Sequence, residues 1–176
     1  MSRASALPDS RMSLPLALAG AVDPDEFRRS VSLFATGIVV LSCSDEEGQV
    51  HGITVNSFTS VSLDPPTVLV SLRAGKSHRL ISRHGHYGAS ILHAGQQPFS
   101  AHFSGRPQEA LQPDFTVRHR LPTLRNCLAW FECETVEKVQ IHDHTLFVAQ
   151  VMACGSEGGA PLMYYGSRYH QAAIAA

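Results

Sequence analysis

Seven short runs of β-branched and other apolar residues constrain the fold of this chain more than any other feature. Runs of this length, separated by turn-forming residues, are typical of antiparallel strands. So many strands in succession can close a sheet on itself, so we expect a mainly β fold, a β-barrel with a few short helices. The runs cover Thr36–Cys43, His51–Asn56, Phe58–Leu63, Thr67–Arg73, Tyr87–Leu92, Cys127–Val139 and Thr145–Cys154.

Three helices are expected around these strands. Asp23 can cap a helix over Pro24–Phe34, with Phe27, Val31 and Phe34 on one face. Apolar residues three and four positions apart predict two more helices, at Lys76–Arg83 and Gln97–Phe103. The stretch Gly105–Leu121 has no clear period, and we expect a long surface loop there.

Length and charge exclude several kinds of protein. The chain of 176 residues suits one domain, which we place at residues 23–176 after a flexible extension at 1–22. Its net charge is −1, which argues against nucleic acid as a partner. No apolar run approaches the ~20 residues of a membrane span, so no membrane association is expected. Four cysteines without C-x-x-C spacing fit reduced thiols in a cytoplasmic protein.

The segment Val50–Pro66 is the first candidate for a binding surface. It places small polar side chains at the junction of two predicted strands, and Thr54 and Asn56 point to the same face of a regular strand. Such a wall suits the edge of a heterocycle. The same residues could instead satisfy backbone groups at the end of a strand, and composition alone favours that reading.

The segment Ser71–Arg79 is the second candidate. It reads as a strand end, a glycine turn and a helix start, so backbone N–H groups and nearby cations could cradle a phosphate. A capped surface helix with solvated charges explains the pattern equally well.

Two further segments have both a chemical and a structural reading. The pair His142 and His144 could bind a metal, but no further ligand follows at the right spacing, so we expect a polar turn and no metal site. The aromatic segment Pro161–His170 could stack on a planar ring or pack a subunit interface, and the interface is the simpler explanation.

Six segments in order resemble the short-chain flavin reductases that serve two-component flavin-dependent monooxygenases. They are FATGIVVLS, VHGITVNSFTSVSLDPP, VLVSLRAGKS, AHFSG, DHTLFVAQV and PLMYYGSRYH, within about Asp25–Gln171. The resemblance implies an FMN-binding split barrel of Greek-key antiparallel strands, and a homodimer. It also implies an enzyme that uses NADH or NADPH to reduce FMN or FAD, and a monooxygenase that receives the reduced flavin.

The same resemblance implies which residues form the site. His144 matches a histidine beside the nicotinamide, and Tyr169 matches an aromatic residue that helps to hold the pyridine nucleotide. Gly48–Gly52 is expected close to the flavin. The implied cofactor-binding residues are Gly52, Thr54, Val55, Asn56, Ser57, Phe58, Thr59, Pro65, Ser71, Leu72, Arg73, Ala74, Lys76, Ser77, Phe103, Ser104, Gly105, Arg106, His144 and Tyr169.

His142 departs from the family pattern, which has glycine at that position. If the residue adopts a left-handed conformation, a side chain there costs ~1 to 2 kcal/mol and could narrow the nicotinamide pocket. Two alternatives stay open beside the reductase. The first is a flavin- or haem-binding split barrel without turnover, for which His142 would be the cause, and the second is an enzyme like pyridoxamine-phosphate oxidase, which shares the barrel.

Overall fold

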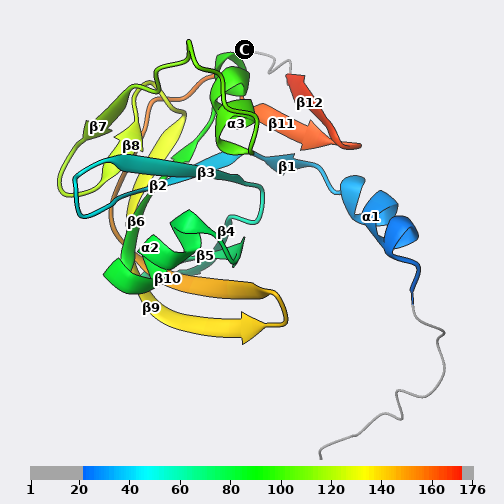
Figure 1. Cartoon of the computed structure of the whole chain (residues 1–176), viewed down its shortest axis with the longest axis horizontal. Coiled ribbons are helices and arrows are strands. Elements are labelled where there is room, and N and C mark those ends of the chain that lie inside the picture. The colour runs from blue at the N-terminus through cyan, green and yellow to red at the C-terminus, as the bar shows by residue number, and fades with distance from the viewer. Residues whose placement is uncertain (1–21, 172–176) are drawn as a thin grey trace, which may run out of the picture.

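A computed structural model describes residues 22–171 and confirms a mainly β, antiparallel architecture (Figure 1). The main sheet has seven strands in the order β3-β2-β6-β9-β10-β5-β4, and all its neighbours are antiparallel. These strands are β2 (Val39–Ser44), β3 (Val50–Val55), β4 (Thr59–Leu63), β5 (Pro66–Arg73), β6 (His86–Ile91), β9 (Ala129–Ile141) and β10 (His144–Ser156).

Two smaller sheets complete the strand inventory of the described residues. The first, in the order β1-β11-β12, contains β1 (Thr36–Gly37), β11 (Leu162–Tyr165) and β12 (Arg168–Gln171). The second pairs β7 (Phe115–Val117) with β8 (Pro122–Leu124). The first sheet matters for the site, because it brings the C-terminal aromatic segment against the start of the β region.

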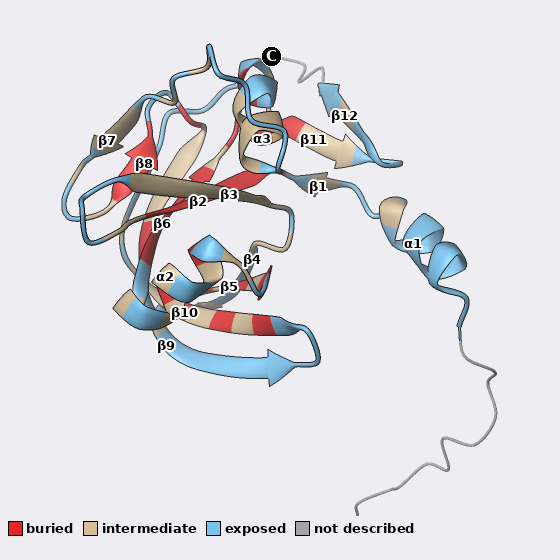
Figure 2. Cartoon of the chain, in the orientation of Figure 1, coloured by how far each residue is buried: buried red, intermediate tan, exposed pale blue. Residues whose placement is uncertain are grey.

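Strand β2 lies between two apolar cores, and this explains why the run Ile38–Leu41 is apolar throughout. Side chains alternate along a strand, so Val39 and Leu41 enter one core, and Ile38 and Val40 enter the other. The first core includes Phe147 of β10, and the second includes Leu162 of β11. The buried strands stand out in red in Figure 2.

The helices are α1 (Pro24–Ser32), α2 (Lys76–His84) and α3 (Gln97–Phe103), with a 3-10 turn at Ala94–Gln96 before α3. The predicted cap of α1 is confirmed, because the Asp23 carboxylate accepts from the N–H of Asp25. Helix α2 ends at Gly85, whose left-handed backbone (φ 74°) lets its N–H bond the carbonyl of Ile81. Helix α1 projects from the body of the molecule (Figure 1) and buries none of its residues.

The structure corrects several predicted elements. The run Thr36–Cys43 is two strands, because the chain leaves one sheet and enters another at Ile38. The first helix ends two residues before Phe34. The β9–β10 hairpin extends to Ile141 and His144, where exposed polar residues hid the strand pattern.

The predicted loop Gly105–Leu121 contains strand β7, and β8, β11 and β12 were not anticipated. These strands have only three or four residues each, which is too short to show a period. The predicted extension at 1–22 lies outside the described residues except for Val22. Among residues 22–171, none of the helices has the length and apolar character needed to cross a bilayer.

Candidate functional site

Three adjoining cavities share Asn56, at the end of β3. The first has a volume of about 400 Å³ and is lined by Ile38, Thr54, Val55, Asn56, Ser104, Arg106, Tyr164, Ser167 and Tyr169. The second, of about 420 Å³, is lined by Phe34, Ala35, Thr36, Gly37, Val39, Asn56, Ser57, Phe58, Thr59 and Ile91. The third, of about 480 Å³, lies beside α1 and shares Phe34, Tyr164 and Ser167 with the others. We call these three cavities together the Asn56 groove.

One wall of the groove is fixed by hydrogen bonds through the buried Ser100 of α3. The hydroxyl of Thr54 donates to the carbonyl of Ser100 at 2.8 Å, and the Ser100 hydroxyl lies 2.9 Å from the hydroxyl of Tyr169. The rings of Tyr164 and Tyr169 meet edge to face, with centroids 5.5 Å apart. The wall therefore combines strand, helix and C-terminal hairpin in one arrangement.

Gly52 is part of the support of this wall. A Cβ atom at Gly52 would lie 2.6 Å from the ring of Phe103, so only glycine lets α3 pack this closely on β3. The space above Gly52 is thus filled by Phe103, which packs against the core that contains Ile38 and Val40.

The opposite end of the groove is joined to strand β5. The hydroxyl of Ser57 donates to the carbonyl of Ser71 at 3.1 Å and accepts from its N–H at 3.0 Å. The ring of Phe58 packs against Phe131, with centroids 5.3 Å apart. These contacts hold the turn after β3 in place, so the polar side chains of this turn sit on a supported backbone.

The β9–β10 hairpin presents His144 on the face of the sheet that Ser71 shares. His144 pairs in register with Arg73, two residues along β5 from Ser71, so these three side chains project to the same side. The Nδ1 atom of His144 lies 2.9 Å from a carboxylate oxygen of Asp143, and Arg73 Nε lies 3.5 Å from the other oxygen. The hydrogen bond from His144 is the main cause that lowers the pKa of Asp143.

His142 has the left-handed conformation on which the sequence argument depended, with φ 51°. A non-glycine residue is disfavoured there. The carbonyl of His142 accepts a hydrogen bond from the Gln140 amide at 2.8 Å. Within residues 22–171, no group of three or more His, Cys, Asp or Glu side chains is placed to hold a metal ion.

The proposed phosphate cradle at the start of α2 has one of its cations engaged. Lys76 lies 3.8 Å from the carboxylate of Asp45, which also bonds His51 Nε2 at 2.5 Å. The hydrogen bond from His51 is the main cause that lowers the pKa of Asp45. The side chain of Ser77 is buried.

The structure brings only part of the predicted set together. The predicted residues that line the groove are Thr54, Val55, Asn56, Ser57, Phe58, Thr59, Ser104, Arg106 and Tyr169. Phe103, Gly105 and Ser71 lie next to lining residues in sequence or by direct contact, and Gly52 lies against Phe103. Those absent from the lining are Pro65, Leu72, Arg73, Ala74, Lys76, Ser77 and His144. Leu72 in particular is 2% exposed and packs in the core.

Several lining residues were not anticipated. Ile38 and Phe34–Gly37 reach the groove because the chain crosses between sheets there. Tyr164 and Ser167 come from the C-terminal aromatic segment, where only Tyr169 was assigned to the cofactor. The cluster of tyrosines could have predicted Tyr164 as a lining residue, whereas no local pattern indicated Ile38.

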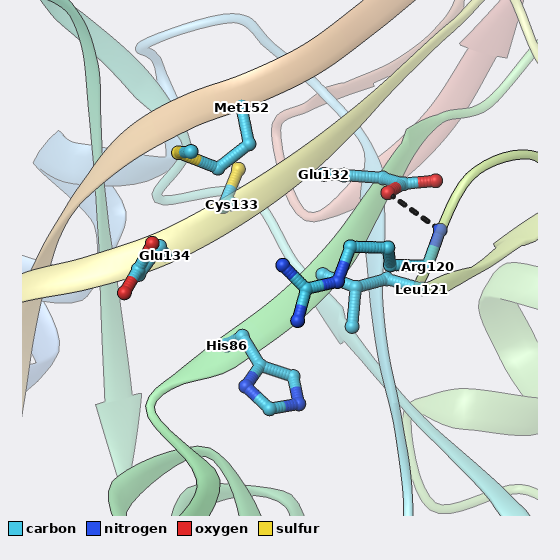
Figure 3. A pocket seen from close by; sticks show the side chains of 7 residues that line it. All are labelled: His86, Arg120, Leu121, Glu132, Cys133, Glu134 and Met152. Carbon is cyan, nitrogen blue, oxygen red and sulfur yellow. Dashed lines mark hydrogen bonds between the residues drawn. The ribbon is translucent and has the colours of Figure 1, made fainter.

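A separate cavity of about 190 Å³ lies beside β6 and β9 (Figure 3) and shares no lining residue with the groove. Its floor includes the buried Glu132, whose two carboxylate oxygens accept from the N–H groups of His119 and Arg120, each at 3.0 Å. Glu132 therefore holds the loop before β8 in place. We interpret this cavity as part of the structural support of that loop and not as a binding site.

The antiparallel sheets with three short helices, and the likeness to solved flavin reductases of the same fold, define the class: a split-barrel protein. The family model for the flavin reductase like domain matches residues 31–173. The chain belongs to this family and is an NAD(P)H-dependent flavin reductase.

Individual proteins support the same assignment. The chain is 55% identical to the NADH-dependent flavin reductase StyB of Pseudomonas fluorescens, over 90% of this chain and 96% of that protein. The solved styrene monooxygenase flavin reductase of Pseudomonas putida is 54% identical, with a TM-score of 0.81 over 85% of this chain and 99% of that one. An NADH:FAD oxidoreductase of Streptomyces globisporus, solved with NAD and FAD fragments, is 27% identical, with a TM-score of 0.76 over 88% and 98% of the two chains. The predicted family, fold and enzyme class are confirmed.

Proposed function

We propose that the Asn56 groove binds the flavin and that the reduced flavin passes to a separate monooxygenase component. The observation that carries this proposal is the position of Asn56, whose side chain lines all three adjoining cavities. A relative that is the flavin reductase of a styrene monooxygenase supports the kind of partner. When bound, the flavin accepts at N5 the hydride that the nicotinamide gives up from C4.

The residues of the groove fit a flavin in size and chemistry. Each cavity falls within the range of about 300–1,000 Å³ that is usual for small-molecule sites. Asn56, Ser57 and Thr59 offer polar groups for the edge of the ring, and Arg106 offers a cation for the phosphate side. The hydroxyl of Thr54 donates its proton to the carbonyl of Ser100, so Thr54 stabilises the wall of the groove and has no proton to donate to the flavin. We propose FMN or FAD as the flavin of this site.

His144 is suited to hold the nicotinamide. Its Nδ1–H donates to the Asp143 carboxylate, so in the neutral ring Nε2 is an acceptor. We assign this acceptor to the amide N–H of the nicotinamide carboxamide. Hydride transfer needs no general base at this point, so we give His144 a binding role.

The His144→Ala variant tests this role. We expect the KM for NADH to rise about tenfold, because one hydrogen bond to the donor is lost, while the dissociation constant of the flavin stays unchanged. Steady-state kinetics and a flavin titration measure the two quantities. His86→Ala, in the separate cavity, is the matched control and should change neither. Equal loss of flavin and NADH affinity would contradict the assignment.

We propose NADH as the preferred donor. Arg73, the cation nearest to His144 in the sheet, is engaged by the Asp143 carboxylate, which would repel a 2′-phosphate. The NADH dependence of the StyB relative supports the same choice.

We further propose that the chain forms a homodimer through the apolar face of α1. Phe27 and Val31 are 61% and 52% exposed on this helix, and Phe34 just beyond it is 75% exposed. An isolated helix of nine residues is marginal in water, so it needs a packing partner. A second copy that covers Phe34 would also cover an edge of the Asn56 groove.

The Phe27→Glu variant tests the dimer. Burying an unpaired carboxylate is costly, so we expect light scattering during size-exclusion chromatography to show a dimer for the wild type and a monomer for the variant. Arg29→Glu, on the same helix but outside the lining of all three cavities, is the control and should leave the mass unchanged. A monomeric wild type would overturn the proposal.

We also propose that residues 23–176 form one domain and that the protein works in the cytoplasm. The family match from residue 31 to 173 supports the domain. All four cysteines are free thiols, which fits a reducing compartment.

A further inference from the structure

A chain of hydrogen bonds runs from helix α2 to the turn that carries His144. The Nε2 atom of His78 lies 2.8 Å from the hydroxyl of Thr145. That hydroxyl donates to the side-chain oxygen of Gln140 at 2.7 Å. The Gln140 amide then donates to the carbonyl of His142 at 2.8 Å. Three side chains thus link the helix to the backbone of the turn.

These three hydrogen bonds can donate in only one direction, from His78 toward His142. A threonine hydroxyl has a single proton, and Thr145 gives it to Gln140. His78 must therefore donate through Nε2–H to the Thr145 oxygen. The oxygen of Gln140 accepts and its NH2 group donates, which also fixes the orientation of the amide. Each of the three bonds then joins one donor to one acceptor.

This series of hydrogen bonds begins beside the core and ends at His142, which has the least favourable backbone conformation of the β9–β10 hairpin. Thr145 is 6% exposed, and the ring of His78 packs edge to face on the fully buried Phe147, with centroids 5.4 Å apart. At the other end, His142 has φ 51°, a conformation that side chains other than glycine seldom hold. His144 follows His142 by two residues and closes the same turn.

We propose that His78, Thr145 and Gln140 are positioning residues for His144. Their hydrogen bonds hold the Ile141–His144 turn in the conformation that presents the His144 ring to the nicotinamide. The proposal rests on the role of His144 given above. It also explains how the turn keeps a left-handed residue other than glycine, because the carbonyl of that residue has a defined partner.

The test compares Thr145→Val with Thr145→Ser in the full chain. Valine has nearly the same shape but has no hydroxyl, so both links at Thr145 are lost; serine keeps the hydroxyl and loses a methyl group. We expect Thr145→Val to raise the KM for NADH about fivefold, with kcat and the flavin dissociation constant within twofold of wild type. Thr145→Ser should return the KM to within about twofold of wild type.

Gln140→Ala provides a second variant that is expected to fold, because Gln140 is exposed. It removes the last two links, leaves the bond between His78 and Thr145, and should raise the KM for NADH in the same direction. A role in stability only would change kcat, flavin binding and KM together, and serine would not restore the KM. Such a pattern would overturn the proposal.

His144→Ala separates this proposal from the role of His144 itself. If His144→Ala raises the KM while Thr145→Val and Gln140→Ala leave it at the wild-type value, the positioning role is wrong and the role of His144 stands. If His144→Ala leaves the KM unchanged, both are wrong. When both hold, adding Thr145→Val to His144→Ala should cause no further rise, because the two act through one group.

Discussion

Replacing Gly88 with alanine is expected to lower the free energy of unfolding by about 3 kcal/mol, the upper end of what overpacking costs. Gly88 is buried in β6, and a Cβ atom there would lie 2.0 Å from the carbonyl oxygen of Pro122. That oxygen already accepts from Ser42 at 2.5 Å, and Thr123 next to it is fully buried. The backbone of β8 must therefore shift or β6 must bend. Urea unfolding followed by the fluorescence of the only tryptophan, Trp130, measures the effect.

Gly37→Ala is the matched control for this prediction. A Cβ atom at Gly37 meets no atom within 4 Å, so we expect a change within about 0.5 kcal/mol. A loss of similar size in both variants would point to a general cost of replacing glycine and would contradict the specific contact with β8.

Replacing Asn56 with tryptophan is expected to reduce kcat/KM for the flavin about a hundredfold, which corresponds to about 3 kcal/mol. Asn56 lines all three cavities of the groove, so a large ring there fills the space that we assign to the flavin. Its side chain is exposed, and the melting temperature should therefore change little. Steady-state kinetics with varied flavin and a thermal melt give the two values.

Leu63→Trp controls for the added ring. Leu63 is 90% exposed at the end of β4 and lines none of the three cavities. This variant should keep wild-type kinetics. Unchanged flavin kinetics in Asn56→Trp would move the flavin site elsewhere on the protein.

The central strands could be predicted from the sequence because burial leaves a local pattern. A strand that is buried on both faces is a continuous apolar run, and a strand that is buried on one face alternates apolar and polar residues. Strand β2 is the clearest case, since its apolar run serves two cores. The break at Ile38 left no such pattern, because residues on both sides of it are strand residues in different sheets. The four short strands β7, β8, β11 and β12 are defined by their partners and not by their own composition.

The candidate site was predictable only where one segment supplies it. Thr54–Thr59 lines the groove as expected because the segment is continuous. Ile38 and Phe34 join it through the crossing of the two sheets, which no local pattern records. Conversely, Leu72 lies within a matching motif, yet alternation along β5 turns its side chain into the core. The family resemblance raised a left-handed backbone at His142 only as a condition, and no sequence pattern indicated the bond from Gln140 that supports it.

The most direct test of the central claim is the loss of NADH absorbance with purified full-length protein, with and without added FMN or FAD. The proposed function predicts NADH oxidation that depends on added flavin and falls about a hundredfold in Asn56→Trp at limiting flavin. The same experiment ranks the two flavins. Flavin binding without NADH oxidation would contradict the claim and would identify a split barrel that binds flavin but does not turn over.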